Sequence, residues 1–189
     1  KTIAPEDVLH LGDFDWRAVA APGHDMGALM FYSAELKLLI SGDALWQNGL
    51  GAITPKAGVN PGVEAALATL QSMRELNIEV VIPGHGKPFI DVNEAIARAE
   101  SRLRAYQAEP LKCARNFLKS IFTFHLLEVG CMNVEDVANY FARVPCYVDI
   151  NAEFFHLTPQ ALADLLTSEL LAVQAIKVEQ RKVYPLMAV

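Results

Sequence analysis

Three short apolar segments of this 189-residue chain each end at a glycine that is followed at once by a residue able to bind a metal ion. The first segment ends at Pro-Gly-His24, the second at Ser-Gly-Asp43 and the third at Pro-Gly-His85. Because glycine allows a tight turn, each segment can hold the next side chain rigidly at the end of a strand. The pattern predicts a sheet whose strand ends carry two imidazoles and one carboxylate.

The segments around these motifs show, in turn, the apolar patterns typical of β-strands and of α-helices. Apolar runs predict strands at residues 15–21, at 28–41 in two runs joined by Ala34-Glu35, and at 79–83. One-sided apolar stripes predict helices at residues 63–76 and 92–108. Strands that alternate with helices indicate an α/β domain.

The dipeptide Glu109-Pro110 interrupts this alternation and predicts a domain boundary. Residues 1–109 then form the α/β domain, and residues 110–189 form a second, mostly helical module that begins with a helix at 111–129.

Capping signals organise this second module. Asn133 can cap one helix, and Thr158 can cap another that has Pro159 at its first helical position. The final residues predict a two-stranded ribbon that turns near Glu179-Gln180. Helices followed by a β-ribbon are typical of a winged-helix module.

The amino-acid composition and net charge exclude several classes of protein. Hydrophobic residues make up 52% of the chain and charged residues 20%, which excludes a disordered polypeptide. The net charge of −6 argues against nucleic acid as a partner, and no apolar run reaches the about 18 residues of a membrane span. The cysteines, Cys113, Cys131 and Cys146, are odd in number and form no CxxC pair, so we expect core thiols in a cytoplasmic protein.

His24, Asp43 and His85 are the candidate metal ligands, since imidazole and carboxylate suit zinc, iron or manganese. They are too far apart for a local motif and can meet only through the fold. Each motif alone also fits a plain surface turn. Trp46 and Tyr32 flank the motifs and are candidates for lining a substrate cleft, although both also fit ordinary packing.

Together, PGHDMGALMFY, LLISGDALW and VVIPGHGKPF resemble the third, fourth and fifth metal-binding motifs of the metallo-β-lactamase superfamily. The resemblance covers residues 7–90 and implies two divalent metal ions, expected to be zinc, with iron and manganese as alternatives. It implies that His24 binds one ion, His85 the other, and Asp43 bridges both. The implied fold is α/β, the C-terminal half of an αββα sandwich, followed by a winged-helix-like module.

One departure from the family is large. The family carries an HxHxDH motif well before the Pro-Gly-His, whereas this sequence has none, and His10, His125 and His156 are isolated. We therefore expect the chain to be the C-terminal portion of a longer protein. On its own it should be inactive, and its partner should be the missing N-terminal half or a second copy of the chain.

The resemblance implies a dinuclear hydrolase that cleaves a small-molecule thioester, lactone or other acyl ester through a metal-bound hydroxide. A metal-dependent RNA nuclease is the alternative reaction, and a winged-helix nucleic-acid-binding regulator is the alternative from another class. Charge argues against the regulator, because residues 111–189 contain seven Lys or Arg and eight Asp or Glu. The helix at 159–171 has no basic residue, so we expect the module to serve packing, dimerisation or as a lid.

Overall fold

The computed structural model describes residues 2–186, which form two compact units. The first unit contains the described residues up to Ala108 apart from Pro55–Gly58. The second unit contains Pro55–Gly58 and the described residues from Glu109 onward.

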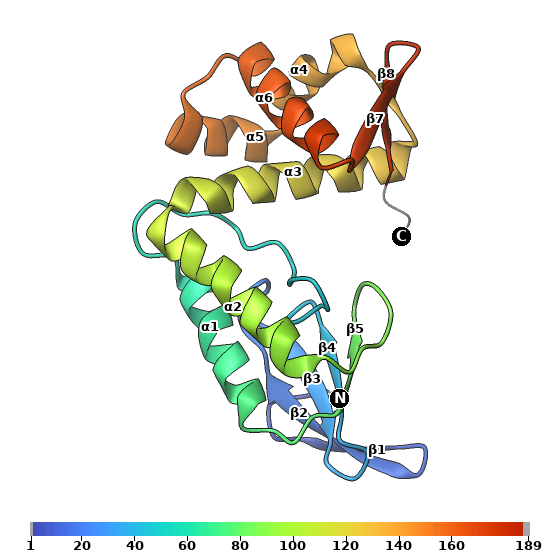
Figure 1. Cartoon of the computed structure of the whole chain (residues 1–189). Helices are drawn as coiled ribbons and strands as arrows, with labels where there is room; N and C mark the ends of the chain where they lie inside the picture. Colours follow the sequence, from blue (N-terminus) through green and yellow to red (C-terminus); the bar gives the residue numbers. More distant parts are fainter. Residues whose placement is uncertain (1, 187–189) are drawn as a thin grey trace. The chain divides into compact units, whose positions relative to one another are not determined.

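A five-stranded sheet forms the centre of the first unit, in the order β1-β2-β3-β4-β5 (Figure 1). Its strands are β1 (Val8–Leu11), β2 (Phe14–Ala20), β3 (Leu29–Ser33), β4 (Leu38–Gly42) and β5 (Val80–Pro83). Neighbouring strands are antiparallel except β4 and β5, which are parallel because the chain crosses between them through α1 (Pro61–Arg74). Together with α2 (Val92–Ala108), α1 covers one face of the sheet.

Helix α1 forms where the sequence signals predict it. The side chain of Asn60 accepts hydrogen bonds from the backbone N–H groups of Gly62 and Val63, and Pro61 occupies the first turn. The apolar stripe of the helix is buried and consists of Val63, Ala66, Leu70 and Met73. Predicted and observed helices agree within two residues here, and the helix predicted at 92–108 is α2.

The two faces of the sheet differ in burial. Met30, Leu39 and Val81 are fully buried on the helix-covered face. On the opposite face Ile40 pairs with both Phe31 and Ile82, and these two isoleucines keep 36% and 37% of their surface exposed. The first unit therefore buries one apolar face and leaves a second apolar row half-covered.

Strand β1 was not predicted. Its sequence, Val-Leu-His-Leu, is too short to give a clear apolar alternation, and its side chains are mostly exposed. Its backbone is held instead by antiparallel pairing with β2.

The second unit surrounds its own core with helices and a three-stranded sheet in the order β6-β8-β7. Its elements are α3 (Pro110–Val129), β6 (Met132–Asn133), α4 (Val134–Arg143), α5 (Pro145–Ile150), the π-helix η1 (Asn151–Phe155), α6 (Pro159–Ala172), β7 (Ile176–Glu179) and β8 (Lys182–Pro185). Aromatic rings pack against one another among the aliphatic side chains of this core. Phe141 stacks on Tyr147 at 4.2 Å between ring centroids and meets Phe122 edge-on at 5.0 Å.

The capping predictions have different outcomes. The hydroxyl of Thr158 accepts a hydrogen bond from the N–H of Ala161 at 3.2 Å, which confirms the cap of α6. Asn133 occupies the cap position of α4, but its side chain makes no capping bond and donates to Asp136 at 2.8 Å. The capping role predicted for the Asn133 side chain was therefore wrong.

The predicted ribbon is present as β7 and β8, and its turn lies at Gln180 and Arg181, both with positive φ. The third strand, β6, was not predicted because it is only two residues long. The short helix α5 and the π-helix η1 were not predicted either.

Within the described residues the three cysteines form no disulfide, and their environments differ. Cys113 is buried as predicted, and burial raises the pKa of its thiol to about 11. Cys146 is half-buried and packs against the core of the second unit, whereas Cys131 is half-buried without belonging to that core, so the prediction was wrong for Cys131. Within residues 2–186, no helix is both long and apolar enough to cross a membrane.

Candidate metal centre

The three predicted ligands meet in the first unit. Nε2 of His24 lies 3.7 Å from Oδ2 of Asp43, and Nε2 of His85 lies 3.8 Å from Oδ1 of the same carboxylate. The carboxylate therefore stands between two imidazoles, and each imidazole faces its own oxygen. The fold brings together residues that lie 19 and 42 positions apart in the sequence.

The turn that carries His24 is seated on α1. The hydroxyl of Thr69 donates to the carbonyl of Pro22 at 2.8 Å, and a Cβ at position 23 would lie 2.8 Å from that of Ala66. Glycine at position 23 thus permits the close approach of turn and helix.

The imidazole of His24 is oriented by a backbone contact. Its Nδ1 lies 2.6 Å from the carbonyl oxygen of Ala52. Because a carbonyl can only accept, Nδ1 carries the proton, and in the neutral ring Nε2 keeps the lone pair that faces Asp43. Metal-binding histidines commonly have such a partner on the second nitrogen.

Asp43 follows β4 at the point where the parallel neighbour β5 ends. The N–H of Gly84 donates to the carbonyl of Gly42 at 2.8 Å, which ties the two strand ends together. A Cβ at position 84 would lie 2.9 Å from Oδ1 of Asp43, and one at position 51 would lie 2.7 Å from Cγ of His24. Glycine is therefore required at both positions by space. The need at position 51 was not apparent from the sequence, because that residue belongs to none of the three motifs.

Of the two aromatic candidates, only Trp46 lies at this centre. Its indole Nε1–H donates to Oδ1 of Asp43 at 3.1 Å, and its ring meets that of His85 edge-on at 5.1 Å between centroids. Tyr32 is 7% exposed, and its hydroxyl donates to the carbonyl of Asn77 at 3.0 Å. The structure does not bring Tyr32 to the metal-ligand candidates.

The centre is open to solvent. Its donor types suit a pair of metal ions, but its donors are too few to hold them firmly. The side chains of His24, Asp43 and His85 are 41%, 35% and 49% exposed. In the described part of the chain, no group of three or more His, Cys, Asp or Glu could hold a metal ion. Each position between an imidazole and a carboxylate oxygen has two protein donors, whereas a catalytic zinc commonly has three.

The remaining histidines are engaged elsewhere. Nδ1 of His10 lies 2.9 Å from Asp15 on the exposed β1–β2 hairpin. The ring of His125 stacks on Tyr140 at 4.3 Å, and His156 ends the π-helix in the left-handed conformation. This agrees with the expectation that these three histidines are isolated.

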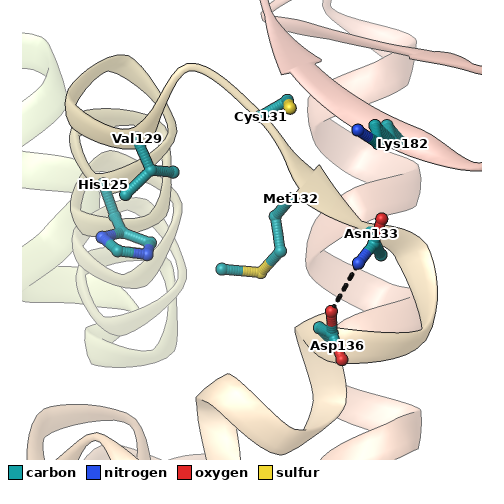
Figure 2. Close-up of a pocket in the computed structure, with 7 residues that line it drawn as sticks. All are labelled: His125, Val129, Cys131, Met132, Asn133, Asp136 and Lys182. Carbon is teal, nitrogen blue, oxygen red and sulfur yellow. Dashed lines mark hydrogen bonds between the residues drawn. The ribbon is translucent and has the colours of Figure 1, made fainter.

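The second unit contains a separate pocket of about 350 Å³. Figure 2 shows the side chain of Met132 extending toward His125 across this pocket, and the hydrogen bond between Asn133 and Asp136 at its edge. Its lining residues are His125, Val129, Cys131, Met132, Asn133, Asp136 and Lys182. None of the predicted site residues belongs to it.

Known proteins resemble this chain in sequence and in fold. Residues 2–85 match the family model of the metallo-beta-lactamase superfamily. Acyl-coenzyme A thioesterase MBLAC2 of Gallus gallus is 29% identical over 83 residues, which are 44% of this chain and 30% of the relative. Hydroxyacylglutathione hydrolase of Rhodobacter capsulatus is 43% identical over 51 residues, which are 27% of this chain and 20% of the relative.

The likeness in fold extends through both units. The crystal structure of a metallo-beta-lactamase family protein from Thermus thermophilus matches 97% of this chain with a TM-score of 0.51 and 17% identity. At this identity the likeness concerns the fold alone. The chain spans 53% of that protein and less than a third of the two curated relatives. The expectation that the chain is the C-terminal portion of a longer protein stays a prediction.

Proposed function

We propose, from the metallo-beta-lactamase superfamily match of residues 2–85, that this chain contributes to a dinuclear metal-dependent hydrolase of acyl esters. The observation that carries the proposal is the Asp43 carboxylate with one imidazole Nε2 facing each of its oxygens, at 3.7 Å and 3.8 Å. His24 would hold one ion, His85 the other, and Asp43 would bridge them.

Each residue has a defined task in this arrangement. Divalent ions bound there would supply Lewis acidity and lower the pKa of bound water toward neutrality. Asp43 would neutralise part of their charge and, with one oxygen facing each imidazole, would keep the two positions together. His24 presents the lone pair of Nε2 because the Ala52 carbonyl holds its Nδ1 proton.

The proposed substrate class is a thioester, with lactones and other acyl esters as related candidates. Two relatives support it by name, one an acyl-coenzyme A thioesterase and the other a hydroxyacylglutathione hydrolase. Because one fold can host many reactions, these names support the class of reaction and not a particular substrate.

The shortage of donors leads to a proposal about the partner. A metal centre built on His24, Asp43 and His85 needs further ligands that the described residues do not place beside them. We propose that a segment outside this sequence or a second copy of the chain supplies them. The half-exposed row of Phe31, Ile40 and Ile82 offers an apolar surface for such a partner.

The second unit is proposed to be a winged-helix-like module with a packing or dimerisation role. Its helices are followed by the β7–β8 hairpin, which is extended by β6. Its basic side chains are largely engaged with acids. Both Arg115 and Lys119 contact Glu169 of α6, at 3.1 Å and 2.9 Å, and Arg181 contacts Glu135 at 3.2 Å. These pairings leave little free charge for phosphate groups, which argues against a nucleic-acid reader.

Cobalt binding tests the ligand assignment. The full chain is titrated with Co²⁺ and followed by visible absorption. We expect His24→Ala and Asp43→Ala each to lower the affinity by more than about tenfold, since even the loss of a partner outside the ligand set has that effect. His10→Ala is the matched control, because it removes the imidazole of another His–Asp pair in the same unit. Unchanged affinity in both ligand variants would overturn the assignment.

Zinc content and mass test the partner. After dialysis we expect fewer than two zinc ions per chain, a mass above 20.7 kDa by light scattering, and little hydrolysis of an acyl-coenzyme A thioester. A monomer with two tightly bound zinc ions would contradict the proposed shortage of ligands. Cleavage of RNA in place of the thioester would favour the nuclease.

A further inference from the structure

The loop that follows Asp43 returns to the metal-ligand candidates after one tight turn. We define it as the site loop, residues 44–51. Trp46 and Gly49 pair across the turn, and the N–H of Gly51 donates to the carbonyl of Asp43 at 2.8 Å. At its start, the buried hydroxyl of Ser41 donates to the carbonyl of Leu45 at 2.6 Å. Both ends of the site loop are therefore fixed to β4.

Two arginines of α2 bind the tip of the site loop. Arg98 donates to the carbonyl of Gln47 from both Nε and Nη2, at 3.0 Å and 2.7 Å. Arg102 donates to the carbonyl of Asn48 at 3.1 Å. Nη2 of Arg98 also contacts Asp91 at 2.6 Å, and the side-chain amide of Gln47 donates to the same carboxylate at 3.0 Å. We call Asp91, Arg98 and Arg102 the loop clamp.

The loop clamp is charged at neutral pH. The hydrogen bond from Arg98 holds the pKa of the Asp91 carboxyl below its ordinary value. A guanidinium that donates twice to one carbonyl and also pairs with a carboxylate has little freedom to rotate. A lysine could not make this planar, forked contact.

Trp46 connects the clamped loop to Asp43. Its indole N–H binds Oδ1, the oxygen that faces His85, whereas Oδ2 faces His24. Rotation of the carboxylate would break this bond and move both oxygens. A fixed indole therefore fixes which oxygen each imidazole meets.

We propose that Trp46 and Arg98 are positioning residues, which together orient the Asp43 carboxylate between the two metal positions. Trp46 lies on the site loop, and Arg98 on helix α2 holds that loop in place. The proposal rests on the proposed function for its metal ions, but the orientation itself is a property of the metal-free chain. Arg98 acts through the site loop, and Trp46 acts directly on Oδ1.

The indole proton tests the orientation without metal. The chain has two tryptophans, so Trp16→Phe identifies the Nε1–H signal of Trp46 in ¹H–¹⁵N spectra. We expect Arg98→Met to speed hydrogen exchange at that proton at least about tenfold, because a bond to a charged acceptor is weakened. Arg104→Met is the matched control, since Arg104 lies on the same helix and, within the described residues, its side-chain hydrogen bonds go to Gln107 and Glu100. Equal exchange in Arg98→Met and wild type would overturn the proposal.

Cobalt affinity tests the consequence for the metal ions. We expect Trp46→Phe, which keeps a ring and removes the donor, to weaken Co²⁺ binding by about tenfold, and Arg98→Met to act in the same direction. Arg98→Lys should not restore binding, whereas Trp16→Phe and Arg104→Met should match wild type. Full affinity in Trp46→Phe would overturn the positioning role. The two-donor positions should bind Co²⁺ weakly but measurably in the wild-type chain; if it binds none, the ligand assignment of the proposed function fails, while the exchange measurement still decides the orientation of Asp43.

Discussion

The two units differ in how completely they bury their apolar side chains. The second unit packs its helices and its three-stranded sheet around one core, in which Phe122, Tyr147 and Leu166 are fully buried. The first unit buries one face of its sheet and leaves Ile40 and Ile82 more than one-third exposed on the other. Its candidate metal ligands also contribute too few donors. The partner and the metal ions proposed above therefore both concern the first unit.

This difference also separates chemistry from stability. In the first unit, polar side chains gather on turns after β4 and β5, where glycines permit close backbone approach. In the second unit, His125 is stacked on Tyr140 and lines a pocket that contains none of the predicted site residues. Replacing buried core residues of the second unit is therefore expected to lower the free energy of unfolding. Replacing the candidate ligands of the first unit is expected to lower the metal affinity.

The largest effect on stability is expected in the closed core. Phe122→Ala removes a ring that is fully buried and contacts Phe141, and should lower the free energy of unfolding by about 3–5 kcal/mol. Urea unfolding followed by circular dichroism measures this loss. Phe124→Ala is the control on the same helix, because its ring is 46% exposed and should contribute much less. Equal losses would contradict a closed core around Phe122.

Neighbouring residues of β4 test the one-sided burial of the first unit. Leu39→Ala should cost about 2–5 kcal/mol, because its side chain is fully buried beneath the helices. Ile40→Ala should cost less than about 1 kcal/mol in the free chain, since that side chain already meets water. A cost for Ile40→Ala that equals that for Leu39→Ala and rises with protein concentration would mean that copies of the chain cover this face.

Regular elements were predictable because local signals agree with the fold. The cap and stripe of α1 and the apolar runs of β3 and β4 depend on residues close in sequence. The candidate ligands were identified from their motifs, and the structure brings them together, while their metal binding stays a prediction. The site loop was not, since its conformation depends on Arg98 and Arg102, which lie 51 and 54 positions beyond the carbonyls they bind. Tyr32 was misjudged for the same reason, because its hydrogen bond to Asn77 spans 45 positions.

Thiol reactivity tests how firmly the first turns of α3 are packed around the buried Cys113. Since burial raises the pKa of Cys113 to about 11, little thiolate forms at pH 8, and alkylation should be about 100-fold slower in the folded chain than in urea. Mass spectrometry of iodoacetamide-treated chain locates the label, with Cys131 as the partly exposed comparison. Rapid labelling of Cys113 in the folded chain would show that α3 opens readily.

The smallest effects are expected at two helix caps of the second unit. Thr158→Ala removes a bond from the N–H of Ala161 to the Thr158 hydroxyl and should cost about 1 kcal/mol. Asn133→Ala removes a side chain that occupies a cap position without capping, and should cost only about a few tenths of a kcal/mol. The two substitutions differ in whether a backbone N–H loses its partner, and urea unfolding of both variants compares them directly. A larger loss for Asn133→Ala would mean that its bond to Asp136 orders the start of α4 in place of a cap.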